Sequence, residues 1–127
     1  EIASRPGGAR IIEMIEVAYQ YNITEAYVRA ECGLDYHNPT FPLGKVVGHA
    51  VPAPKNGTLV DAPTETPFSW VKRYRLNTQL GTSFHGVENS SQHIAYMNVE
   101  ASDEEQLQER LNEVNNWFEQ ACVWESQ

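Results

Sequence analysis

The chain has 127 residues, of which 41% are hydrophobic and 20% are charged, as expected for one globular domain with a real core. Its net charge of −8 argues against nucleic acid or an anionic membrane as a partner, because both repel an acidic surface. No apolar run approaches the ~20 residues of a membrane span, and no signal-like stretch is present. Cys32 and Cys122 lack metal-ligand spacing, so we expect two buried thiols and a reduced, cytoplasmic setting.

The first ten residues place an acidic residue, an arginine and two glycines ahead of a predicted helix. Glu1 and Ile2 have the pattern of a strand end, because Pro6-Gly7-Gly8 interrupts any regular element. In an extended segment Glu1 and Arg5 share one face. A carboxylate suits magnesium, a guanidinium suits phosphate, and glycine N–H groups at a helix start suit an anion. The stretch indicates a metal–phosphate site at a strand-to-helix junction.

The same stretch, Glu1-Ile2-Ala3-Ser4-Arg5-Pro6-Gly7-Gly8, resembles the E-x-N-x-R-x-G-G signature near the end of the ATP-grasp fold. The form is that of carboxylate–amine ligases of the L-amino-acid ligase type. In such enzymes ATP phosphorylates a carboxylate substrate, and an amine substrate attacks the acyl phosphate. The resemblance implies that Glu1 binds Mg²⁺, that Arg5 is catalytic and contacts the transferred phosphoryl group, and that Gly7 and Gly8 form the substrate-binding turn. Ala3 replaces the usual Asn and cannot contact metal or phosphate.

A looser similarity continues through the rest of the chain and divides it into two parts. Residues 1–37 would end the ATP-grasp core, and residues 38–127 would form a small antiparallel β subdomain with a C-terminal helix. The chain starts at a glutamate rather than a methionine, so we expect a fragment that is inactive alone, with the other nucleotide and metal ligands upstream.

Two other interpretations stay open. In the first, Glu1 and Arg5 form a solvated ion pair on a surface turn, and the chain is a non-catalytic binding or dimerisation module. In the second, the fold is ATP-grasp but the enzyme belongs to another branch, such as biotin-dependent carboxylases or purine-pathway ligases.

Two helices are predicted first, over residues 9–21 and 24–32. The first has apolar residues at helical spacing and should expose Arg10, Glu13, Glu16 and Gln20 on its outer side. The second should be capped by Asn22 or Thr24 and ended by Gly33, with Tyr27 and Val28 in the core. The pair is expected to pack as a helix hairpin.

Four strands are expected next, over residues 45–51, 58–60, 68–80 and 93–99. Asn56-Gly57 predicts a hairpin turn between the first two. Residues 68–80 should bury an aromatic face, and residues 81–91 should form a turn region. Ser102-Asp103-Glu104-Glu105 is a capping box that starts a final helix. The order predicts an α+β fold, an antiparallel sheet covered by the terminal helix.

The remaining candidate residues carry weaker signals. His49 and His93 lie in predicted strands and could meet across a sheet as a zinc site, whereas His37 and His85 have no ligand pattern. Lys72, Arg73 and Arg75 form a basic cluster that suits a carboxylate or phosphate, or a solvated strand face. Trp117 and Phe118 belong to the apolar stripe of the last helix, and an exposed remainder could serve a homodimer.

Overall fold

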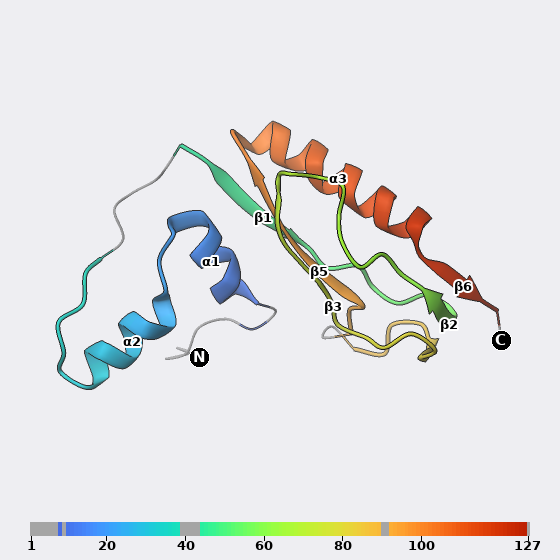
Figure 1. Cartoon of the computed structure of the whole chain (residues 1–127), viewed down its shortest axis with the longest axis horizontal. Helices are drawn as coiled ribbons and strands as arrows, with labels where there is room; N and C mark the ends of the chain where they lie inside the picture. The colour runs from blue at the N-terminus through green and yellow to red at the C-terminus, as the bar shows by residue number, and fades with distance from the viewer. Residues whose placement is uncertain (1–7, 9, 39–43, 90–91, 127) are drawn as a thin grey trace.

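The structure is a computed structural model, and it describes residues 8, 10–38, 44–89 and 92–126. Within these residues three helices and six short strands form two antiparallel sheets, so the predicted α+β class is confirmed (Figure 1). The elements are α1 (Ile11–Tyr19), α2 (Ile23–Glu31), β1 (Val46–Ala50), β2 (Asn56–Asp61), β3 (Val71–Leu76), β4 (Ser83–His85), β5 (Ala95–Ala101), α3 (Glu104–Ala121) and β6 (Val123–Glu125).

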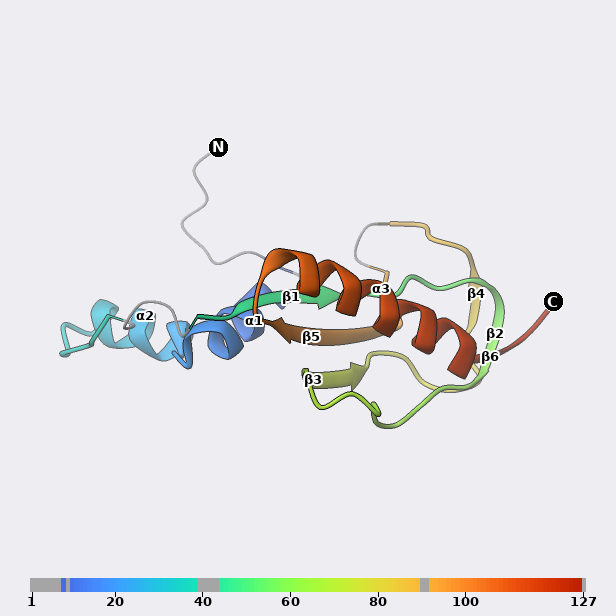
Figure 2. The ribbon, with the colours of Figure 1, turned by 90° about the horizontal axis from the view of Figure 1, so that it is seen from above.

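Sheet A, with strand order β1-β5-β3, has a helix on each face. Adjacent residues of β1 show this, because side chains alternate between the faces of a strand. Gly48 lies against Leu107 of α3, where an added Cβ would be 3.2 Å from a leucine methyl carbon. His49, the next residue, contacts Met14 of α1. Figures 1 and 2 show α3 running along the sheet and α1 on its other side. The central strand β5 is therefore buried on both faces.

Sheet B has the strand order β4-β2-β6, so β2 lies between β4 and the C-terminal strand β6. The predicted hairpin between residues 45–51 and 58–60 is wrong, because β1 pairs with β5 while β2 pairs with β4 and β6. Asn56 and Gly57 lie inside β2 rather than in a turn. The predicted turn region 81–91 contains β4, and β6 has no counterpart among the predicted strands.

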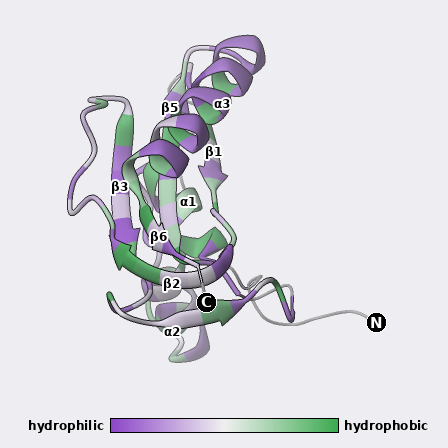
Figure 3. Cartoon of the chain, turned by 90° about the vertical axis from the view of Figure 1, so that its right-hand side faces the viewer, coloured by the Kyte–Doolittle hydropathy of each residue, from purple (hydrophilic) through white to green (hydrophobic). Residues whose placement is uncertain are grey.

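The core lies between the sheets and α3. Val114 and Phe118 of α3 are buried there, as the apolar stripe predicts, and Leu59 of β2 and Met97 and Val99 of β5 are fully buried against them. Figure 3 shows the outer side of α3 as hydrophilic. The strand expected over residues 68–80 is shorter, at Val71–Leu76, and its pairing with β5 shifts register between Val71 and Arg73.

The predicted cap of α2 is confirmed, and the cap of α3 lies one residue later than predicted. Asn22 caps α2, accepting a hydrogen bond from the Glu25 N–H at 2.9 Å. The cap of α3 is Asp103 rather than Ser102, and its carboxylate accepts from the Gln106 N–H at 2.8 Å. Gln106 completes the box by accepting from the Ser102 N–H at 3.0 Å. The bond from the Gln106 N–H and, next in size, the bond from the Ser102 hydroxyl lower the pKa of Asp103.

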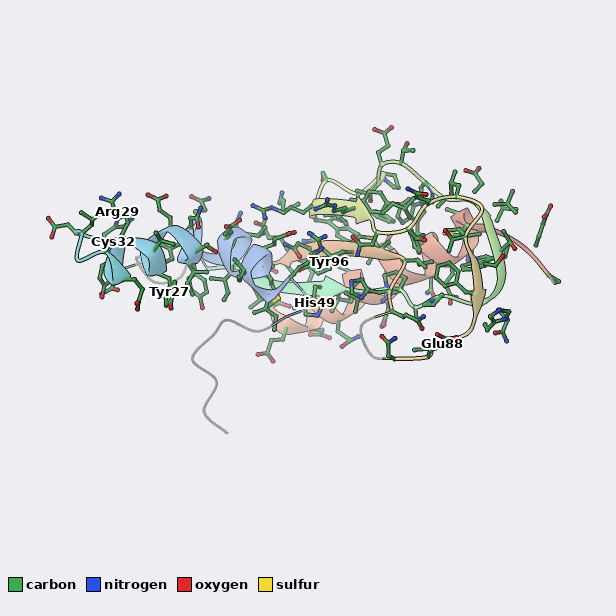
Figure 4. The ribbon with its side chains drawn as sticks, turned by 90° about the horizontal axis from the view of Figure 1, so that it is seen from below. Tyr27, Arg29, Cys32, His49, Glu88 and Tyr96 are labelled. Atoms are coloured by element: carbon green, nitrogen blue, oxygen red, sulfur yellow. The ribbon has the colours of Figure 1, made fainter. Side chains whose placement is uncertain are left out.

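The environment of α2 differs from the prediction. Tyr27 and Val28 are 52% and 53% exposed, so they are not core residues, and Figure 4 shows Tyr27 projecting from the helix. Cys32 is also exposed, whereas Cys122 is buried as expected. Among the described residues no helix has both the length and the apolar character to cross a bilayer.

Candidate functional site

The residues assigned by the resemblance lie at the start of the chain. Glu1, Arg5 and Gly7 are outside the described residues, so the predicted strand end and its roles stay predictions. Gly8 is exposed in a turn, and its carbonyl accepts a hydrogen bond from the Ile11 N–H at 3.2 Å. Among the described residues, no atom lies within 4 Å of a Cβ added at Gly8.

The start of α1 is held against sheet A. Arg10, the N-cap residue, has a left-handed backbone with φ of 59°, and its side chain does not cap the helix. The Tyr96 hydroxyl of β5 donates a hydrogen bond to the Arg10 carbonyl at 2.9 Å. The Arg10 guanidinium lies 5.8 Å from the centre of the Tyr96 ring and pairs with Glu13 at 2.5 Å. Backbone and side chain of Arg10 are therefore both fixed beside Gly8.

The sheet beneath α1 supplies polar residues from three strands. His49 of β1 stacks on Tyr96, with ring centres 5.9 Å apart, and its Nδ1 lies 3.4 Å from the Met14 sulfur (Figure 4). On β3, Arg73 bonds to Glu16 of α1 at 2.9 Å. Asn98 is directly opposite His49 in the strand register. We call Arg10, Glu13, His49, Tyr96 and Asn98 the α1 junction.

This arrangement corrects the predicted orientation of α1. Arg10, Glu13 and Glu16 were expected on the outer side of the helix, yet their side chains are only 24–30% exposed. They bond to one another or to sheet A. The apolar residues Ile11 and Ile15 are only half-buried and line an open groove between α1, β1 and the start of α3. The helix is amphipathic, but its polar residues meet a polar sheet face.

Burial determines the protonation of the junction. Burial and, to a smaller extent, the nearby Glu13 carboxylate together raise the pKa of Tyr96 to about 12, against smaller opposing effects of Arg10 and Arg73. The hydroxyl thus keeps its proton and donates at neutral pH. Asn98 is fully buried, and its amide makes no hydrogen bond with the described part of the chain. The amide does lie close enough to Tyr96 to oppose the rise in pKa, as the weakest of these influences.

Charge pairing defines what the junction can do chemically. Its arginine is neutralised by Glu13, and Arg73 beside it is neutralised by Glu16, so the junction offers no free cation of its own. Its role is to position the Gly8 turn and the first turn of α1. The Ile11 N–H bonds to the Gly8 carbonyl, and the next N–H groups of the first turn, which have no side-chain cap from Arg10, are of the kind that suits an anion.

The other candidates do not form a site in the described residues. No group of three histidine, cysteine or acidic side chains there could hold a metal ion, which removes the zinc site of His49 and His93 in that part of the chain. The basic cluster is dispersed. Lys72 lies 3.7 Å from Glu100, Arg73 bonds to Glu16, and Arg75 is exposed.

Sequence reasoning missed Tyr96 and Asn98 as junction residues. Their signal is the alternation along β5, where Ala95, Met97 and Val99 face the core and the polar residues lie between them. Polar residues on one face of a central strand indicate that the element packed on that face also has polar residues there.

Neither a comparison with protein-family models nor a search of the curated proteins finds a significant match to this chain.

Proposed function

We propose that this chain is the C-terminal part of an ATP-grasp ligase that joins a carboxylate to an amine through an acyl phosphate. The supporting sequence is Glu1–Gly8, with the acidic residue, arginine and glycine pair of the ligase signature. The observation that carries the proposal is the helix start beside it: α1 begins three residues after Gly8, and Tyr96 fixes it to sheet A. A turn held in this way would suit the binding of a transferred phosphoryl group, which requires preorganised donors.

Each residue of the signature then has one task. Glu1 would hold Mg²⁺, which neutralises nucleotide phosphate charge when bound. Arg5 would contact the phosphoryl group as it moves to the carboxylate. Gly7 and Gly8 would present backbone N–H groups to the substrate anion, at the positive end of the α1 dipole. Tyr96 and Arg10 would position the turn without touching the substrates.

Ala3 alters one part of this assignment. The signature has Asn there, and an alanine methyl group offers no oxygen to metal or phosphate. The proposal therefore places metal binding on Glu1 and on acidic residues outside this chain. An Ala3→Asn variant of the full-length protein should bind Mg²⁺–ATP more tightly than the native protein.

The test is ADP release by the full-length protein, with Mg²⁺, ATP and a mixture of amino acids as carboxylate and amine substrates. Arg5→Ala should lower the rate by about 10²–10³, the effect of removing one transition-state donor. Arg29→Ala is the matched control, because within the described part of the chain this exposed arginine of α2 pairs with Glu25 and with the Asp35 carbonyl. The control should keep the native rate.

A near-native rate for Arg5→Ala would defeat the assignment. Dependence of ADP release on bicarbonate, with no dependence on added amines, would instead indicate the carboxylase branch. The chain alone should release no ADP, since most of the nucleotide pocket would lie outside it.

A non-catalytic dimerisation module is the second candidate, and the exposed apolar residues around α2 favour it. Tyr27, Val28, Leu34 and Tyr36 are each more than half exposed, which is unusual for so many neighbouring large side chains. Sedimentation of the chain alone distinguishes the candidates. A dimer that Val28→Asp dissociates, together with a full-length protein that never releases ADP, would favour the module.

A further inference from the structure

A cavity of about 410 Å³ lies between the C-terminal end of α3, the segment after β1, and β6. This volume is within the range of roughly 300–1,000 Å³ that is typical of small-molecule sites. Its apolar wall is assembled from four separate segments of the chain, with Val51, Pro52, Pro54, Ile94, Phe118 and Trp124. In Figure 2 these elements converge at the end of the molecule opposite α2.

The rim of this cavity carries one charge of each sign. Lys55 Nζ and Glu119 Oε1 are 3.7 Å apart, and the two side chains are 50% and 60% exposed. The two groups form an ion pair, but the separation is too long for a hydrogen bond, so each keeps its hydrogen-bonding capacity for another partner. Asn115 adds an amide to the same lining.

We propose that this cavity binds a small dipolar molecule with an apolar side chain, an apolar α-amino acid being the chemical class. Glu119 would accept from the ligand's ammonium group, Lys55 would donate to its carboxylate, and the apolar wall would bury its side chain. A simple anion would oppose Glu119, and a simple cation would oppose Lys55, so only a ligand with both charges satisfies the rim. The site does not depend on the proposed ligase activity, and binding requires neither ATP nor Mg²⁺.

Cys122 provides a reporter inside this cavity. This residue belongs to the lining and is 9% exposed, and burial raises the pKa of its thiol to about 11. The thiol is therefore protonated at neutral pH and does not compete for the ligand as a charge. Cys32, exposed after α2, is the matched second thiol in the same molecule.

The experiment is an NMR titration of the chain with L-leucine, isovalerate and isoamylamine as probes. L-leucine should shift the Trp124 indole and Cys122 amide signals and bind about tenfold or more tightly than either analogue, each of which loses one charge-assisted hydrogen bond. Lys55→Gln and Glu119→Gln should each lower the affinity for L-leucine about tenfold. Glu113→Gln, on another face of α3, should leave the affinity unchanged.

A thiol measurement separates this cavity from other binding sites. L-leucine should slow alkylation of Cys122 by iodoacetamide and leave the rate at Cys32 unchanged. Three outcomes would overturn the proposal: no shift of Trp124 or Cys122 at millimolar L-leucine, equal affinity for the three probes, or unchanged affinity in both rim variants. Absence of ADP release by the full-length protein has no bearing on this result.

Discussion

The Tyr96 hydroxyl of β5 donates a hydrogen bond to the backbone carbonyl of Arg10 at 2.9 Å, across 86 positions of sequence. The donor is a fully buried side chain of the central strand, and the acceptor is the N-cap residue of α1. The bond therefore connects the most protected strand of sheet A to the helix start beside Gly8.

Tyr96→Phe should lower the free energy of unfolding by about 0.5–1.5 kcal/mol, because it removes this one hydrogen bond and keeps the ring. Urea unfolding followed by circular dichroism measures the change. Tyr27→Phe is the matched control, since Tyr27 is half exposed on α2 and should lose almost nothing. Equal effects of the two substitutions would show that the bond to Arg10 contributes no stability.

Stability should decline as the pH rises from 10 to 12. Burial raises the pKa of both Tyr74 and Tyr96 from the usual 10 to about 12. In this interval the unfolded chain releases protons that the folded chain keeps, so the free energy of unfolding falls with rising pH. Urea midpoints across the interval test this. The double variant Tyr74→Phe/Tyr96→Phe should show a shallower decline, and an identical slope would contradict the assignment.

The ion pair between Arg73 of β3 and Glu16 of α1 should stabilise the docking of α1 on sheet A. Its atoms are 2.9 Å apart and both side chains are partly exposed, so we expect a coupling of about 0.2–1 kcal/mol. A double-mutant cycle with Arg73→Gln and Glu16→Gln measures it, and added salt should reduce it. A coupling of zero at low salt would show that hydrogen bonding and packing alone position the helix.

Local patterns in the sequence predicted the helices and strands better than they predicted which strands pair with one another. The caps at Asn22 and near Ser102, and the apolar stripe through Val114 and Phe118, depend on residues three or four positions apart. Strand pairing depends on residues far apart. No short pattern around β2 indicates that its partner is β6, two positions beyond α3, and strands of three residues are too short for a period to be read.

The candidate site was predictable only in part, for a related reason. The motif Glu1–Gly8 is contiguous and can be recognised, whereas the α1 junction combines residues of α1, β1 and β5. Helical periodicity separated the apolar from the polar residues of α1 but could not show that both meet sheet A, where Met14 contacts His49 and Glu16 bonds to Arg73. A polar strand face, with Tyr96 and Asn98, allows the polar residues of α1 to be partly buried together with its apolar ones.

The Asn56-Gly57 pair correctly indicated the backbone conformation of Gly57 but not the element that contains it, which is a strand rather than a turn. The Asn56-Gly57 pair predicts a backbone with positive φ, and Gly57 has φ of 125°. The reason is not a hairpin turn. Here β2 passes so close to β6 that a Cβ on Gly57 would collide with the Glu125 carbonyl oxygen.

Gly57→Ala should therefore lower the free energy of unfolding by more than about 2 kcal/mol, since it combines backbone strain with a collision against main-chain atoms. Gly81→Ala is the matched control: Gly81 also has positive φ, at 86°, but open space around it, so strain alone should cost about 1 kcal/mol. Urea unfolding gives both values, and the Trp124 indole signal should move only in Gly57→Ala, where β6 must shift. Equal losses in the two variants would mean that the approach of β6 to β2 imposes no constraint.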